Sequence, residues 1–150
     1  MRLVIQRVKY ASVTIDGNVH GKIDKGFMVL VGFKEGDEES YIKPMAEKMA
    51  GLRIFEDENE KMNLALGDVD GDILAISQFT LYADCKKGRR PSFVEAMNPQ
   101  KAEEFYNKFV EVCHNITGKK IETGIFGADM KVELLNNGPV TICMDTKNKE

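Results

Sequence analysis

The chain has 150 residues, with 43% apolar and 30% charged side chains and a formal net charge of -3. This length and composition are typical of one soluble domain, and we treat residues 1–150 as a single domain. No stretch approaches the roughly 18 consecutive apolar residues that would cross a bilayer, and the N-terminus lacks a signal-peptide pattern. These features exclude a membrane protein, and the net charge excludes a chain that is basic overall.

The cysteines and histidines predict neither a disulfide framework nor a metal site. Cys85, Cys113 and Cys143 are odd in number and form no CxxC pair, which indicates a reducing, cytoplasmic setting. His20 and His114 stand alone, with no spacing suited to zinc. Glycine-rich phosphate loops are also missing. We therefore expect no metal and no cofactor.

The first third of the chain predicts strands followed by a helix. Residues 1–15 mix polar–apolar alternation with β-branched side chains, and Asp16–Asn18 has the composition of a tight turn. Phe27–Phe33 is almost wholly apolar, as in a strand buried on both faces. Residues 39–52 then place apolar side chains at helical spacing, with Pro44 near the first turn.

The remaining chain predicts a strand, a long helix and more strands. The pattern of residues 71–82 predicts one strand. Asn98 can cap the following helix, Pro99 suits its first position and Gly118 can end it. The whole pattern predicts an α/β fold, with a largely antiparallel or mixed β-sheet and two main helices.

Two strand-like runs near the end of the chain flank Asn136–Pro139. Asn137-Gly138 between apolar runs is a strong hairpin signal, because both residues tolerate positive φ. Pro139 follows at once and removes a backbone N–H that a strand leaving the turn would donate. The segment is therefore either an ordinary hairpin or a backbone held in a special shape. The composition of the last residues, 145–150, indicates a frayed polar tail.

The stretch "SQFTL", residues 77–81, places polar side chains in an apolar segment. Strand alternation would put Gln78 and Thr80 on one face with Tyr82, and Ser77 on the other. Such a face is either the wet side of an edge strand or the wall of a polar pocket. Thr80 could act as a nucleophile only with a base to activate it, and the sequence identifies none.

A short basic stretch follows this segment. Lys86, Lys87, Arg89 and Arg90 gather within five residues. They form either a solvated loop or a contact for phosphates, and the stretch alone favours the first interpretation.

Taken together, "SQFTL" and "NNGPVT", residues 136–141, resemble the two signature motifs of the D-aminoacyl-tRNA deacylases, also called the D-tyrosyl-tRNA deacylase family. The resemblance extends to "MRLVIQRV" at the start, "LRIF" and "KMN" in the middle and "GIFGADM" before the second motif. Asn137 occupies the variable position of the second motif.

The resemblance implies a cytoplasmic homodimer that hydrolyses the ester of D-aminoacyl-tRNA and has active sites at the subunit interface. In this family the Gly-Pro peptide is cis and reaches into the partner's site, which here would be the role of Gly138 and Pro139. An L-amino acid would then direct its side chain into main chain, whereas glycyl-tRNA would pass.

The resemblance also implies roles for individual residues. Backbone N–H groups around Phe79 and Thr80 would orient the ester, within a catalytic motif that includes Ser77 and Gln78. Gln78 and Phe79 would seat the terminal adenosine, and Arg7 would hold the partner's Gly138–Pro139 loop. The pocket wall would contain Ala102, Phe126 and Met130, and tRNA would contact Lys86, Lys87, Arg89 and Arg90.

Three alternatives remain open at this point. Catalysis could depend on Thr80 or on the 2′-hydroxyl of the tRNA itself, and the lack of a base favours the second. A non-catalytic tRNA-binding module would bind tRNA without regard to the amino acid. A small hydrolase of free D-amino-acid esters or peptides would need Thr80 and no RNA.

Overall fold

The computed structural model describes residues 1–146 and is built around one long strand. This strand, β1 (Arg2–Ile15), pairs along its whole length with β8 (Lys131–Asp145). On its other flank β1 pairs with β3 (Gly26–Gly32) over its first half and with β2 (Asn18–Ile23) over its second half. The predicted turn is present, because Asp16 and Gly17 both have positive φ.

The sheet is mixed, as the sequence predicted. Its order is β2-β1-β3-β6-β7, with β8 added beside β1. The strands β6 (Asp72–Ser77) and β7 (Glu122–Thr123) continue the sheet in parallel with β3. A separate small hairpin joins β4 (Phe55–Glu56) to β5 (Met62–Leu64).

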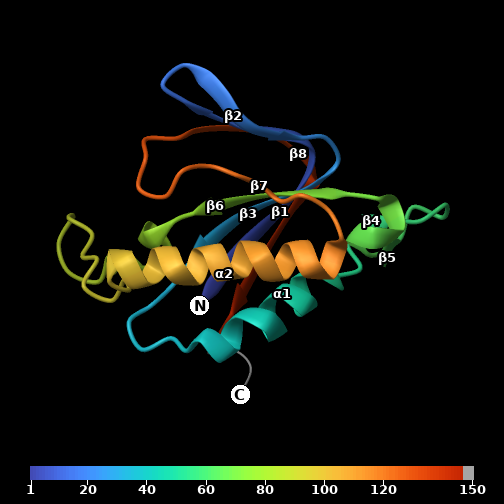
Figure 1. Cartoon of the computed structure of the whole chain (residues 1–150). Helices are drawn as coiled ribbons and strands as arrows, with labels where there is room; N and C mark the ends of the chain where they lie inside the picture. Colours follow the sequence, from blue (N-terminus) through green and yellow to red (C-terminus); the bar gives the residue numbers. More distant parts are fainter. Residues whose placement is uncertain (147–150) are drawn as a thin grey trace.

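Two α-helices cover one face of the sheet (Figure 1). These are α1 (Ile42–Ala50) and α2 (Pro99–Thr117), accompanied by the short 3-10 helices η1 (Glu39–Tyr41), η2 (Leu66–Val69) and η3 (Phe79–Tyr82). The predicted ends of α2 are confirmed: the Asn98 side chain accepts hydrogen bonds from the N–H groups of Gln100 and Lys101, and Gly118 ends the helix at φ 69°. No helix in residues 1–146 is long and apolar enough to cross a membrane.

The core has two parts, one on each side of the sheet. The larger part lies between the sheet and the helices, where Phe27, Met45 and Phe109 are fully buried. The smaller part lies against the opposite side of β1, β3 and β6 and includes Val13 and Leu74. Because both faces of the sheet are covered, β3 is buried along nearly its whole length, as its apolar sequence predicted.

The hairpin signal at Asn137-Gly138 was wrong, because β8 is one strand with a wide bulge. Gln6 pairs with Thr141 and Val8 pairs with Asn136, so residues 137–140 all lie opposite the single residue Arg7. The 14-residue strand β1 holds both halves of β8 in line. The chain therefore bulges outward instead of turning back on itself.

The strand predicted over residues 71–82 ends earlier than expected. It stops at Ser77, and the next residues form the 3-10 turn η3. The alternation that would align Gln78, Thr80 and Tyr82 on one strand face therefore does not apply. A 3-10 helix has three residues per turn, so consecutive side chains point in directions about 120° apart around its axis.

The predicted polar tail is partly ordered. Asp145 ends β8 and binds Arg2, and the N–H of the following residue, Thr146, donates to the Met1 carbonyl at 3.0 Å. The rest of the predicted tail, residues 147–150, lies outside the described residues.

Candidate active site

A pocket of about 290 Å³ opens at the carboxyl ends of the parallel strands β3 and β6. Parallel strands end at the same edge of a sheet, and ligands commonly bind there. The start of α2 and residues 126–130, which precede β8, form the opposite wall. Six of the predicted site residues line this pocket, namely Ser77, Gln78, Phe79, Ala102, Phe126 and Met130.

The turn η3 begins at the pocket, because Gln78 and Phe79 belong to the pocket lining. Gln78 is held by its N–H, which donates to the Val31 carbonyl at 2.8 Å, and Leu81 N–H donates back to the Gln78 carbonyl. The N–H groups of Phe79 and Thr80 come first in the turn, where no earlier carbonyl of the turn can accept them. Such donors can bind a carbonyl oxygen or a developing oxyanion.

Within the turn η3, no basic group lies beside the Thr80 hydroxyl. Its side-chain oxygen accepts a hydrogen bond from the Gln78 amide, and an amide N–H cannot remove a proton. Thr80 itself is exposed and does not contribute to the pocket lining. The arrangement suits Thr80 as a bound hydroxyl better than as an activated nucleophile.

The ionisable side chains of the pocket lining are Tyr106 and Asp129. Burial raises the pKa of Tyr106, whose hydroxyl donates to the Ala75 carbonyl at 2.6 Å. Tyr106 is therefore a neutral structural donor. Asp129 is exposed and pairs with Lys131 at 3.1 Å.

Phe79 forms part of an exposed aromatic pair that the sequence analysis missed. Phe79 is 56% exposed, and its ring meets the Phe93 ring edge-on, with centroids 5.2 Å apart. Exposed aromatic faces beside a pocket are suited to stacking on a nucleobase. Tyr106 was missed too, although its position four residues after Ala102 places both on one face of α2.

The second motif forms the wide bulge in β8. The Gly138–Pro139 peptide is cis, and both residues are exposed. The bulge is closed from within, since the Asn136 side chain accepts the Val140 N–H at 2.8 Å. Val140 is buried and anchors the bulge in the core.

Arg7 holds the bulge of its own chain, and the contact with the partner's loop that the resemblance implies stays a prediction. Its Nε donates to the Asn137 carbonyl at 2.8 Å, and Nη1 donates to the Ile54 carbonyl at 2.7 Å. The side chain is buried, and Glu56 lies 3.8 Å away. The reason is the strand pairing, which puts the four residues of the bulge directly opposite Arg7.

A single chain does not bring its two motifs together. Ser77 pairs with Val31, which pairs with Leu3 of β1, whereas the bulge lies opposite Arg7. These levels are four residue steps apart along β1, from Leu3 to Arg7, or about 14 Å at about 3.4 Å per residue. No residue of the segment 136–139 lines the pocket.

The basic residues lie in an exposed loop next to η3. Asp84 and Ser92 close this loop through two backbone hydrogen bonds of 2.8 and 2.9 Å, and Asp84 also accepts the Lys86 N–H. The four basic side chains Lys86, Lys87, Arg89 and Arg90 are all exposed. Within residues 1–146, no group of three or more histidine, cysteine or acidic residues could hold a metal ion.

Comparisons with known proteins point to one family. The family described as D-Tyr-tRNA(Tyr) deacylase matches residues 4–145. D-aminoacyl-tRNA deacylases of Phocaeicola vulgatus and Flavobacterium psychrophilum are 55% and 53% identical to the chain, with both partners covered completely.

Among solved structures, the c-Myc DNA unwinding element binding protein is 40% identical, covers 97% of this chain and 99% of its own, and superposes with a TM-score of 0.91. A probable eukaryotic D-amino acid tRNA deacylase shares the fold, with a TM-score of 0.83 at 15% identity over 95% of this chain and 97% of its own. From the family match and the full-length identity, the chain belongs to the D-Tyr-tRNA(Tyr) deacylase family.

Proposed function

We propose that this protein hydrolyses the ester between a D-amino acid and the terminal adenosine of tRNA, and that it does so in the cytoplasm as a homodimer. The observation that carries the proposal is the pocket at the SQFTL turn, where backbone donors and an exposed aromatic ring meet. The names of the full-length relatives support the same activity. The active domain would be the whole chain, residues 1–150.

The pocket has the properties that this substrate needs. Its volume is near the lower end of the range of small-molecule sites, which suits an aminoacyl group with the attached nucleoside outside. The Phe79 and Thr80 N–H groups would stabilise negative charge on the ester oxygen. Phe79 would stack on the adenosine, with Gln78 beside it.

The separation of the two motifs supports a dimer as the active form. Gly138 and Pro139 are exposed on one chain and remote from that chain's pocket, so they are free to enter the pocket of a second copy. Arg7 would act from within the same chain, by holding the bulge rigid through the Asn137 carbonyl. A rigid carbonyl pair would then receive the amino group of the substrate.

Chiral rejection would follow from this arrangement. If the amino group has only one acceptor site, an L-amino acid must direct its side chain into main chain. D-amino acids of many sizes would be accepted, because no side-chain pocket is required, and glycine would pass. Such exclusion works by clash with the wrong enantiomer.

The first test is hydrolysis of D-tyrosyl-, L-tyrosyl- and glycyl-tRNA by the purified protein. We expect D-tyrosyl-tRNA and glycyl-tRNA to be cleaved, and L-tyrosyl-tRNA to be cleaved at least about 100-fold more slowly in kcat/KM, a ratio within the reach of a steric clash. Binding of all three without hydrolysis would instead support a non-catalytic tRNA-binding module.

A second prediction concerns the basic loop. Replacing its four cations by glutamine should raise KM for D-tyrosyl-tRNA about tenfold or more at physiological salt and leave kcat within about twofold. The slope of log affinity against log salt should become shallower by about 0.7 to 0.9 for each phosphate that the loop no longer neutralises. The variant changes Lys86, Lys87, Arg89 and Arg90.

The matched control removes four exposed lysines elsewhere on the surface and so changes the net charge equally. It should alter both KM and the salt slope much less. Equal effects from the two variants would mean that total charge, and not the loop, governs tRNA binding. The control residues are Lys43, Lys48, Lys61 and Lys120.

A further inference from the structure

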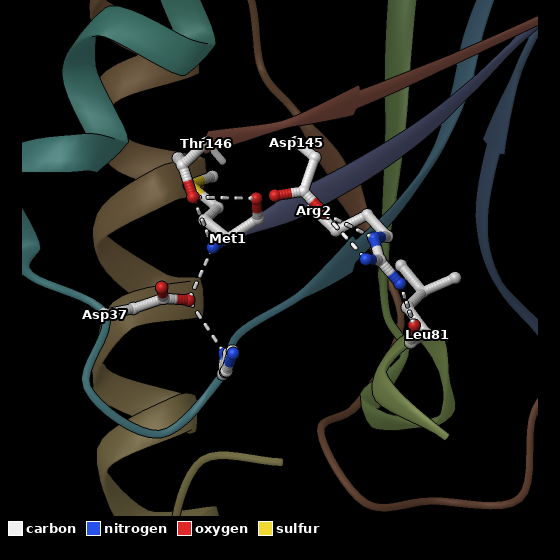
Figure 2. A network of polar contacts seen from close by, with 7 residues as sticks. Met1, Arg2, Asp37, Leu81, Asp145 and Thr146 are labelled. Atoms are coloured by element: carbon white, nitrogen blue, oxygen red, sulfur yellow. Dashed lines mark hydrogen bonds and ion pairs between the residues drawn. The ribbon is translucent and has the colours of Figure 1, made fainter. Parts of the chain in front are cut away.

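We propose that Arg2 is a positioning residue, which fixes the turn η3 and thereby aims the N–H groups of Phe79 and Thr80. The inference rests on the proposed function, since it concerns the rate of the same hydrolysis. Its starting point is that the first strand of the chain reaches the carbonyl end of the catalytic turn (Figure 2).

The Arg2 guanidinium binds a backbone carbonyl and a carboxylate at the same time. Nη1 donates to the Leu81 carbonyl at 2.6 Å, and Nε and Nη2 bind the Asp145 carboxylate at 2.8 and 2.7 Å. The guanidinium also lies over the Tyr82 ring, 4.7 Å from its centroid. Arg2 therefore joins β1, the end of β8 and two residues of η3.

The hydrogen bond to Leu81 acts on the end of the turn that lacks its own partners. The last carbonyls of a helical turn have no following N–H group of the turn that could donate a hydrogen bond to them. A cation near these carbonyls is therefore favourable. The turn has only four residues, Phe79–Tyr82, so a shift of its carbonyl end also reorients the N–H groups at its start. Misplacing reacting groups by about 1 Å can cost about 100-fold in rate.

The strand that carries Arg2 is itself held firmly. The Met1 amino group donates to the Thr146 hydroxyl at 3.0 Å and pairs with Asp37 at 2.6 Å, as Figure 2 shows. Asp37 also accepts the Lys34 N–H at 2.7 Å. The guanidinium thus projects from a fixed base, which a positioning residue requires.

These interactions indicate an effect on geometry more than on overall stability. The Arg2 side chain is 37% exposed and that of Asp145 is 12% exposed, so solvent screens the pair on the Arg2 side and the pair contributes less to folding than a buried pair would. The Leu81 carbonyl, by contrast, lies within the four residues that carry the proposed ester-binding groups. Loss of Arg2 should therefore lower kcat clearly while the melting temperature changes little.

The test compares Arg2→Met and Arg2→Lys with Thr146→Val in the full-length protein. For D-tyrosyl-tRNA we expect Arg2→Met to lower kcat about tenfold and leave KM within about twofold, as for an interaction that acts only in the transition state. Arg2→Lys should recover part of the loss, because an ammonium cannot serve both Leu81 and Asp145 with the geometry of a guanidinium. Thr146→Val removes the hydrogen bond between the Met1 amino group and the Thr146 hydroxyl, which lies beside Arg2 but does not contact η3. This variant should keep wild-type kcat.

Amide hydrogen exchange gives a readout that does not depend on activity. Arg2→Met should speed exchange in residues 79–83 and leave β6 unchanged, whereas Thr146→Val should leave both unchanged. Wild-type kcat in Arg2→Met, or faster exchange throughout the protein, would overturn the positioning role. If the wild type itself did not hydrolyse D-tyrosyl-tRNA, the proposed function would be wrong. Hydrogen exchange would still test Arg2: faster exchange confined to residues 79–83 in Arg2→Met would support its contact with η3, and unchanged exchange there would contradict it.

Discussion

Replacing Gly138 by alanine is expected to lower kcat/KM for D-tyrosyl-tRNA by about 100-fold, as a small displacement of substrate-positioning groups can do. Gly138 has φ 139°, a conformation that residues with a side chain rarely adopt. An added Cβ would lie 2.8 Å from Val140 Cγ2 and 3.0 Å from Arg7 Nη2. The bulge would have to shift, and its carbonyls would shift with it.

The measurement is steady-state hydrolysis of the D- and L-tyrosyl substrates, with circular dichroism to show that the fold is kept. Gly67→Ala is the matched control, because nothing lies within 4 Å of a Cβ at that position. Wild-type rates in Gly138→Ala would contradict the proposal that the bulge enters a pocket. Loss of discrimination with retained turnover would assign the bulge to chiral rejection alone.

A substrate that ends in 2′-deoxyadenosine, with D-tyrosine on its 3′-oxygen, is expected to react about 10³-fold more slowly than the normal substrate. That size is typical of losing one group that stabilises or activates the transition state. The physical reason is the lack of a base at the turn: Thr80 accepts from the Gln78 amide, and the buried Tyr106 hydroxyl donates to a backbone carbonyl. A neighbouring 2′-hydroxyl would assist the attack of water on the ester, a role for which the turn offers no base.

Thr80→Ala provides the complementary test. It should retain kcat within about tenfold of the wild type, which is a change of about 1.4 kcal/mol in the barrier. Thr80→Ser keeps the hydroxyl and serves as the control. Normal cleavage of the deoxy substrate, together with abolished turnover in Thr80→Ala, would refute RNA assistance and favour a threonine nucleophile.

Local patterns predicted both α-helices and the strands β1 and β3, but not the short strands β4, β5 and β7. Asn98, Pro99 and Gly118 mark the ends of α2 because capping depends on nearby backbone groups. The apolar run of β3 reflects a strand buried on both faces. The Asp16-Gly17 turn depends on backbone conformations that few residue types adopt.

The predictions from sequence were wrong where strands far apart in the chain determine the local structure. Residues 78–82 have a strand-like composition, but the chain leaves the sheet after Ser77 and turns. Asn137-Gly138 has hairpin composition, but pairing with β1 keeps both halves of β8 in line. For β8, pairing with β1 outweighed the local turn preference, whereas residues 78–82 have no strand pairing because the ladder of β6 with β3 ends at Ser77.

The sequence by itself determined the mixed α/β class, the two helices and, through its paired motifs, the family. It also identified six of the residues that line the pocket. Only the tertiary structure decided that Arg7 holds its own chain's bulge, that the two motifs of one chain lie apart, and that Arg2 reaches Leu81. These facts depend on the register of β1 against β3 and β8, and register is a property of strands far apart in sequence.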